Sequence, residues 1–228
     1  MNLASTILFL FTTLLSTYTY GVTMTNNTQT AYLAGGCFWG MEELVGQIPG
    51  VIDTEVGYTG GNTPGMQAQE TGHASLPHPN PLPQAVEGTN ESLRALHFNA
   101  VYEQVKTGTT GHAESLKIVF NPAVLTYRHL LFEFFRMHNP TTRNQQGNDV
   151  GTQYRSAIFY LNEEQHRTAL EVIKTADDSG DWKAKIVTEL VPYKEFFRAE
   201  EYHQKYLVKH RGGYTCHYIR RLQLGETN

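Results

Sequence analysis

Cysteine and charge are both scarce in this sequence. Its 228 residues include only 2 Cys, and 18% of them are charged. Two cysteines cannot build a disulfide-rich scaffold, and neither Cys37 nor Cys216 lies in a C-x-x-C pair. A formal net charge of −4 removes the electrostatic basis for general nucleic-acid binding. What the two cysteines do is therefore the first question that the sequence raises.

The N-terminal stretch lacks charged side chains as far as Glu42. Its apolar run, Leu3 to Leu15, is shorter than the ~20 residues that a membrane-spanning helix needs. We therefore expect a signal peptide or N-terminal anchor over residues 1–23, which implies an exported protein, periplasmic or membrane-tethered. The stretch has no Lys or Arg and no clean small-residue cleavage site, so translation from Met24 and a cytoplasmic protein are the alternative.

Beyond this stretch, apolar periodicity and turn residues predict alternating strands and helices. We expect strands at 31–34, 51–58, 116–120, 156–161 and 186–191. We expect helices at 38–47, 127–138, 163–176 and 199–210. This alternation predicts one α+β or α/β sandwich domain, which we place at residues 24–228.

Residues 65–98 break the alternation because they show no usable periodicity. Four of the chain's 9 prolines, Pro77, Pro79, Pro81 and Pro83, alternate within this segment. Such a composition favours polyproline II or open loop, and a loop of this length is unusual inside a compact domain. We interpret 65–98 as an exposed, passive loop insertion, with a proline-motif docking site as the alternative.

The segment from Gly35 to Gly40 (GGCFWG) is the most informative in the chain. Two glycines after a strand allow a tight turn and the close approach of a ligand. Cys37 then falls in the first turn of a helix, where free N–H groups and the helix dipole favour a thiolate. Phe38 and Trp39 offer an apolar wall that suits a small alkyl group. The alternative is a buried, inert cysteine at the end of a strand.

Six motifs in a fixed order give the sequence its family resemblance. They are GCFWG at 36–40, GYTGG at 57–61, TGHAE at 110–114, HNPT at 138–141, QGNDVGTQYRS at 146–156 and EEYHQKYL at 200–207. Because it carries these motifs in this order, the chain from 31 to 220, apart from the insertion, resembles the A-type peptide methionine sulfoxide reductases. We therefore expect an α+β fold, a single two-layer sandwich in which helices pack on a ferredoxin-like mixed sheet.

The resemblance implies an oxidoreductase that reduces the S epimer of methionine sulfoxide, free or in proteins, to methionine. Such an enzyme repairs proteins after oxidative damage. In this family pattern Cys37 attacks the substrate sulfur and emerges as a sulfenic acid. Glu114 supplies a proton to the departing oxygen, for which a carboxyl kept neutral by a dry pocket is suitable.

The resemblance also assigns the residues that bind substrate. Tyr102 and Tyr154 would hydrogen-bond the sulfoxide oxygen, and neutral phenol groups can do so without adding charge. Asp149 would help to order the site, and Phe38 and Trp39 would enclose the methyl group.

Cys216 is the candidate resolving cysteine, in a glycine-containing tail after the last expected helix. By the resemblance, such a tail swings in to form a disulfide with the sulfenic acid. Many family members carry a further resolver before the TGHAE motif, but the corresponding residues here, 105–108, are VKTG. We expect thioredoxin or an equivalent dithiol protein as electron donor. We expect no cofactor and no metal, and a monomer.

Three alternative functions stay open, because the insertion departs from the family pattern and because several histidines could pair with the cysteines. The insertion separates the GYTGG motif from Tyr102, so the chain could be a non-catalytic sulfoxide-binding relic. A Cys–His hydrolase would need a histidine paired with Cys37, for which His112 and His203 are candidates. We interpret His112 as a structural residue, or as one that supports the residues touching the substrate. A zinc role for Cys216 with His217 is weaker, because no second cluster has ligand spacing.

Overall fold

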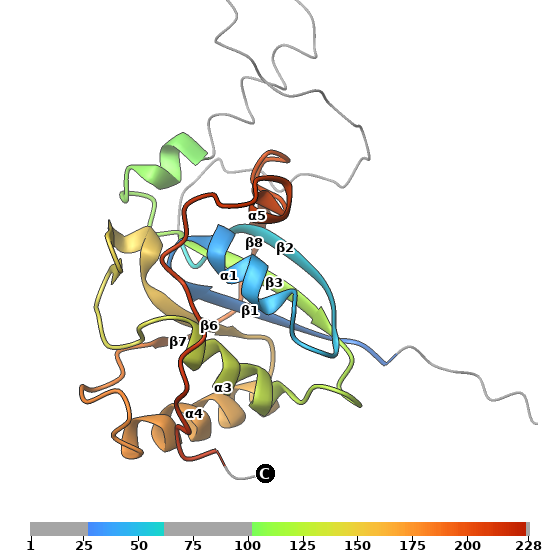
Figure 1. Cartoon of the computed structure of the whole chain (residues 1–228), viewed down its shortest axis with the longest axis vertical. Helices are drawn as coiled ribbons and strands as arrows, with labels where there is room; N and C mark the ends of the chain where they lie inside the picture. The colour runs from blue at the N-terminus through green and yellow to red at the C-terminus, as the bar shows by residue number, and fades with distance from the viewer. Residues whose placement is uncertain (1–26, 62–101, 227–228) are drawn as a thin grey trace, which may run out of the picture.

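A six-stranded mixed sheet forms the centre of this computed structural model, which describes residues 27–61 and 102–226 (Figure 1). Its strands are β1 (Gln29–Gly35), β2 (Val51–Thr59), β3 (Ala113–Phe120), β6 (Ser156–Tyr160), β7 (Glu189–Pro192) and β8 (Phe196–Arg198). They are ordered β7-β6-β1-β3-β2-β8. The candidate leader at 1–23, the alternative start at Met24 and the insertion at 65–98 lie outside the described residues.

The four central strands confirm the expected ferredoxin-like topology. Neighbours in the order β6-β1-β3-β2 are all antiparallel. Helix α1 (Phe38–Val45) joins β1 to β2, and helix α3 (Tyr127–Met137) joins β3 to β6. At the two edges β8 is antiparallel to β2, whereas β7 runs parallel to β6. The parallel pair makes the sheet mixed.

The helices form the second layer of the sandwich because each buries one apolar stripe. Helix α3 places seven side chains in the core, among them Leu130, Phe134 and Phe135. Helix α4 (Glu163–Asp178) packs on α3 and on β6, and Asn162 caps it by accepting a hydrogen bond from the Gln165 backbone N–H. No helix within residues 27–61 and 102–226 is long and apolar enough to cross a membrane.

The helix expected at 199–210 is largely absent, and this prediction was wrong. Only α5 (Tyr206–Lys209) is helical, and Lys205 just before it adopts a left-handed conformation with φ 52°. The Gln204 side-chain amide hydrogen-bonds the backbone of Val56 and Ala199. The segment around Gln204 therefore packs along β2 instead of forming a helix. Side chains that capture backbone groups in this way compete with helix formation.

The chain after α5 returns across the molecule to the helical layer (Figure 1). The Arg220 backbone N–H donates to the carbonyl of Arg136 at the end of α3, and Leu224 is fully buried. Before it reaches α3, this stretch passes the end of β1, where the cysteine turn begins and where the His217 ring contacts the Gly35 carbonyl.

Candidate active site

Cys37 lies at the junction of β1 and α1, as the sequence predicts. It is the N-cap residue of α1 and is 8% exposed. Gly36 before it has φ 102°, and a Cβ at this position would collide with the Gln146 side chain. Glycine is thus required here by both the backbone and the close approach of a neighbouring loop.

Burial, rather than the helix end, decides the protonation of Cys37. Burial raises the pKa of the thiol well above its usual range, and the charge of Glu114 raises it further. The Trp39 backbone N–H lowers the pKa by hydrogen-bonding the sulfur, but this effect is smaller. The expectation that the helix N-terminus yields a thiolate is therefore wrong for the resting protein, in which Cys37 is a thiol.

Glu114 is the second residue of β3 and points into the molecule, with 4% exposure. Its Oε2 accepts a hydrogen bond from the Phe38 backbone N–H at 3.1 Å, directly after Cys37. Burial raises the pKa of Glu114 to about 8, and the charge of Asp149 contributes in the same direction. At neutral pH this carboxyl is protonated, which is the state that the sequence argument requires of a proton donor.

Tyr102, Asp149 and Tyr154 come from three separate segments and converge on this pair. Burial raises the pKa of Tyr154, and the charges of Glu114, Asp149 and Cys37 raise it further. Burial and the charges of Glu114 and Cys37 also raise the pKa of Tyr102. Both phenols are therefore neutral donors at physiological pH. The structure thus brings Cys37, Glu114 and both tyrosines together.

Phe38 and Trp39 have different surroundings, although they are adjacent in the sequence. Phe38 is 2% exposed, and its ring packs against Tyr58 and His203 in the core. Trp39 is half-buried, and its ring stacks on Tyr206 with centroids 3.9 Å apart. A hollow of about 610 Å³ beside Trp39 lies between α1 and α5, and neither Cys37 nor Glu114 lines it.

Cys216 is half-buried, and its thiol donates to Asp149 Oδ2 at 3.3 Å. Burial and this hydrogen bond raise the pKa of Cys216 to about 12, although the backbone N–H of Cys37 also hydrogen-bonds the sulfur and acts in the opposite direction. Both cysteines are free thiols. The tail that carries Cys216 is therefore already placed at the cysteine turn, with its sulfur next to the Cys37 backbone.

His217 holds this tail in place, whereas the sequence had suggested for it only a weak zinc role with Cys216. Its Nε2 donates to the Gly35 carbonyl at 2.7 Å, and the ring is 6% exposed. A Cβ on Gly40 would lie 2.6 Å from Nδ1 of the same ring. The second glycine of GCFWG, Gly40, thus makes room for the His217 ring.

The two histidines considered for a Cys–His hydrolase have other partners. Nδ1 of His203 accepts the Trp39 indole N–H at 3.0 Å, and burial lowers the pKa of this ring to about 4. Nδ1 of His112 accepts the Gly61 backbone N–H at 3.3 Å, which fits the structural role expected of it. Within the described residues, no group of three His, Cys, Asp or Glu side chains could hold a metal ion.

The segment 200–206 contributes more to the site than the sequence argument assigned to it. Beside His203 and Tyr206, which pack on Trp39, Glu200 contacts Tyr58 and Tyr102. The EEYHQKYL motif at 200–207 marked this segment as part of the family pattern. The residue types alone did not show which side chains it contacts.

Comparison with known proteins agrees with this arrangement. The family model described as peptide methionine sulfoxide reductase matches residues 29–76 and 94–227. The unmatched interval, 77–93, lies inside the expected insertion, whose bounds stay a prediction.

Two curated relatives show how far the similarity extends. The chain is 45% identical over 194 residues to peptide methionine sulfoxide reductase MsrA of Mycolicibacterium paratuberculosis, covering 85% of this chain and 91% of that protein. It is 44% identical over 197 residues to MsrA 1 of Mesorhizobium japonicum, covering 86% and 92%.

Solved structures agree with the sequence comparison. The reduced form of Mxr1 from Saccharomyces cerevisiae is 34% identical with a TM-score of 0.66, covering 85% of this chain and 92% of that one. Methionine sulfoxide reductase A of Corynebacterium diphtheriae is 31% identical with a TM-score of 0.63, covering 88% and 84%. The chain belongs to the peptide methionine sulfoxide reductase family, a family of oxidoreductases.

Proposed function

We propose that this protein reduces the S epimer of methionine sulfoxide, free or in proteins, to methionine, with thioredoxin or an equivalent dithiol protein as reductant. Repair of oxidised proteins would be its role. The observation that carries the proposal is the state of Glu114: a buried carboxyl, protonated at neutral pH, bonded to the N–H of the residue after Cys37. A protonated acid beside a nucleophilic sulfur suits a substrate whose oxygen must be protonated before it leaves.

In the first step Cys37 sulfur bonds to the substrate sulfur while Glu114 gives its proton to the sulfoxide oxygen. Glu114 takes up the proton that Cys37 releases, which overcomes the raised pKa of a buried thiol. The substrate S–O bond then breaks as the oxygen is transferred to the Cys37 sulfur, and the transient sulfur–sulfur bond breaks, which releases methionine and leaves Cys37 as sulfenic acid. The sulfoxide gains two electrons and the thiol loses two, so the step balances without a cofactor.

Tyr102 and Tyr154 would hold the sulfoxide oxygen in line with Glu114. Their raised pKa values keep both hydroxyls protonated, so each can donate a hydrogen bond without placing a charge in a buried site. Trp39 and Phe38 would enclose the methyl group. The convergence of these residues with Glu114 and Cys37 favours an active enzyme over a relic that only binds sulfoxide.

In the second step Cys216 attacks the sulfenic acid, forms a disulfide with Cys37 and releases water. Asp149, which accepts the Cys216 S–H hydrogen bond, is placed to take its proton and so to offset the raised pKa. Two electrons from a dithiol protein then reduce the disulfide. Cys216 is the more exposed of the two sulfurs and is the expected point of attack.

The test is a single-turnover assay without reductant on each epimer of a methionine sulfoxide peptide. We expect about one methionine per chain from the S epimer and none from the R epimer, followed by sustained turnover when thioredoxin is added. Absence of product from the S epimer would overturn the proposal. Mass mapping of the purified natural protein's N-terminus would test the export proposal in the same preparation.

A further inference from the structure

Glu200 joins two parts of the active site that are far apart in the sequence. Its Oε1 accepts the backbone N–H of Tyr102 at 3.1 Å, and its Oε2 accepts the Tyr58 hydroxyl at 3.1 Å. Tyr58 belongs to β2 and is fully buried, whereas Tyr102 is the first described residue after the segment 62–101. A single carboxylate therefore fixes the backbone of Tyr102 to the central sheet.

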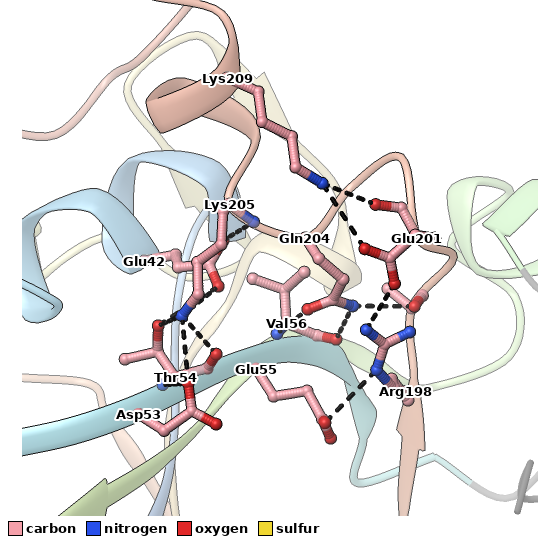
Figure 2. Close-up of polar contacts among 11 residues, drawn as sticks. Glu42, Asp53, Thr54, Glu55, Val56, Arg198, Glu201, Gln204, Lys205 and Lys209 are labelled. Carbon is pink, nitrogen blue, oxygen red and sulfur yellow. Dashed lines mark hydrogen bonds and ion pairs between the residues drawn. The ribbon is translucent and has the colours of Figure 1, made fainter. Parts of the chain in front are cut away.

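Glu200 is itself held firmly because the segment around it is bonded to β2. The Ala199 backbone N–H donates to the Val56 carbonyl at 2.9 Å. The Gln204 amide accepts from the Val56 N–H and donates to the Val56 carbonyl, as Figure 2 shows. These contacts hold the backbone on both sides of Glu200, so the carboxylate has little freedom to follow a displaced Tyr102.

A second set of contacts ties the same segment to the helix that begins at Cys37. The buried carboxylate of Glu42 in α1 accepts the Lys205 backbone N–H at 2.7 Å, which stabilises the left-handed turn there. The Lys205 ammonium reaches Glu42 and Thr54 (Figure 2). The segment 199–205 is thus fixed to both the sheet and α1.

Burying a carboxylate in this position costs free energy unless its oxygens accept hydrogen bonds. Glu200 is 5% exposed, and burial raises its pKa. His203 on the same segment has its Nε2 3.9 Å from Oε2, but burial lowers the pKa of that ring to about 4, so it carries no charge at neutral pH. The carboxylate is satisfied instead by hydrogen bonds from its own backbone N–H, from the Tyr102 N–H and from the Tyr58 hydroxyl, each of which lowers its pKa.

We propose that Glu200 is a positioning residue that sets the place of the Tyr102 hydroxyl in the active site by holding the Tyr102 backbone to Tyr58. The proposal rests on the function proposed above, in which the Tyr102 hydroxyl holds the sulfoxide oxygen. Because 40 residues separate Gly61 from Tyr102, the covalent chain alone gives weak control over where Tyr102 lies. Glu200 acts through Tyr102 and does not touch the substrate.

The experiment is a double-mutant cycle between Glu200 and Tyr102, measured as single-turnover kcat/KM for the S sulfoxide. Glu200→Met conserves volume and removes both acceptors. We expect Glu200→Met and Tyr102→Phe each to lower kcat/KM by about 10- to 100-fold, and the double variant to lie within about 3-fold of Tyr102→Phe, because residues acting as a unit are not additive. Glu200→Gln keeps one acceptor oxygen and should retain activity within about 5-fold of the natural protein.

Glu201→Met is the matched control. Glu201 is the next residue, and its carboxylate is exposed and pairs with Arg198 and Lys209 (Figure 2). We expect its replacement to leave kcat/KM unchanged. If Glu200→Met does not fold, Glu200→Asp, which shortens the side chain by one methylene, takes its place in the cycle.

Hydrogen exchange at the Tyr102 amide separates the two proposals. We expect Glu200→Met to speed this exchange by about 10-fold or more relative to Glu201→Met, because the amide loses its acceptor. Additive losses in the cycle, or unchanged exchange at Tyr102, would overturn the positioning role. A natural protein that protects the Tyr102 amide but yields no methionine would overturn the proposed function while leaving the structural link intact.

Discussion

Cys37 and Cys216 are the same residue type in two contrasting environments. Cys37 is part of a strand-to-helix junction, is 8% exposed and is enclosed by the sheet, α1 and Glu114. Cys216 lies in irregular chain, is half-buried and is held by Asp149 and by the anchoring of His217. The proposed nucleophile thus occupies the more buried position, and the proposed resolver occupies the more exposed one, where a thiol of the proposed dithiol reductant would attack.

Each cysteine also has its own carboxyl neighbour, Glu114 at Cys37 and Asp149 at Cys216. Glu114 is neutral at the buried cysteine, where it can protonate an oxygen. Asp149 accepts a hydrogen bond from the outer cysteine, where a proton must be removed. In the proposed mechanism each carboxyl therefore serves one sulfur: Glu114 exchanges protons at Cys37 and the sulfoxide oxygen, and Asp149 takes the proton of Cys216.

The largest expected effect separates the two cysteines directly. Cys37→Ser should lower single-turnover formation of methionine by about 10⁴-fold or more, because the nucleophile is lost. Cys216→Ser should form one methionine per chain at the natural rate and then stop. Product counting by chromatography distinguishes the two, and full thioredoxin-driven cycling by Cys216→Ser would refute the resolving role.

Replacing the acid tests the inner environment. Glu114→Gln should lower the single-turnover rate by about 10²- to 10⁴-fold, because general acid catalysis is lost. In the natural protein the rate should fall as pH rises above about 8, where Glu114 loses its proton. Rapid-quench measurements across this range would contradict the assignment if the natural protein and Glu114→Gln showed the same profile.

The same group makes stability depend on pH. The pKa of Glu114 is about 8 in the folded protein and about 4.3 in an unfolded chain, so the folded state binds this proton more tightly. Between these two values the free energy of unfolding should fall as pH rises. Glu114→Gln removes this slope, so the variant should gain stability relative to the natural protein between pH 5 and pH 9. Thermal denaturation at both pH values measures this. An equal stability difference between the two proteins at pH 5 and pH 9 would argue against a raised pKa of Glu114.

A smaller effect is expected in the outer environment. His217→Ala removes the bond to the Gly35 carbonyl and should slow formation of the Cys37–Cys216 disulfide by about 10-fold, because a well-held geometry is lost. Methionine formation should be unchanged. Ile219→Ala, an exposed position two residues further along, is the control. Equal slowing of both steps would show that His217 supports the fold in general rather than the resolver.

The smallest effect is expected from deletion of Gly65–Phe98. If this segment is a passive insertion, its removal shortens the connection between Gly61 and Tyr102 and should preserve or raise activity by about 2-fold at most, since loop-closure cost varies slowly with length. Circular dichroism would confirm that the shortened chain folds. Lost activity with a native spectrum would mean that the segment contributes to the site.

The sequence predicted the elements whose apolar pattern is local and strong. The α3 stripe of Leu130, Phe134 and Phe135 and the Asn162 cap of α4 are of this kind. The helix expected at 199–210 failed because Gln204 and Glu42 bind backbone groups across long sequence distances. No local pattern contains such information.

In the candidate site too, local patterns were predicted from the sequence and long-range contacts were not. The motifs pointed to Cys37 and Glu114, and the resemblance in the C-terminal tail pointed to Cys216, but the contacts of Glu200 and His217 form only in the folded chain. The sequence also left two states open for Cys37, a thiolate at a helix end or a buried cysteine, and only the folded chain shows that burial has the larger effect on its pKa.

The most direct measurement is mass mapping of the chain after one turnover without reductant, on the S sulfoxide. The proposed mechanism predicts one methionine and one Cys37–Cys216 disulfide per chain, in equal amounts. Methionine formed with Cys37 left as sulfenic acid and Cys216 still a free thiol would contradict it.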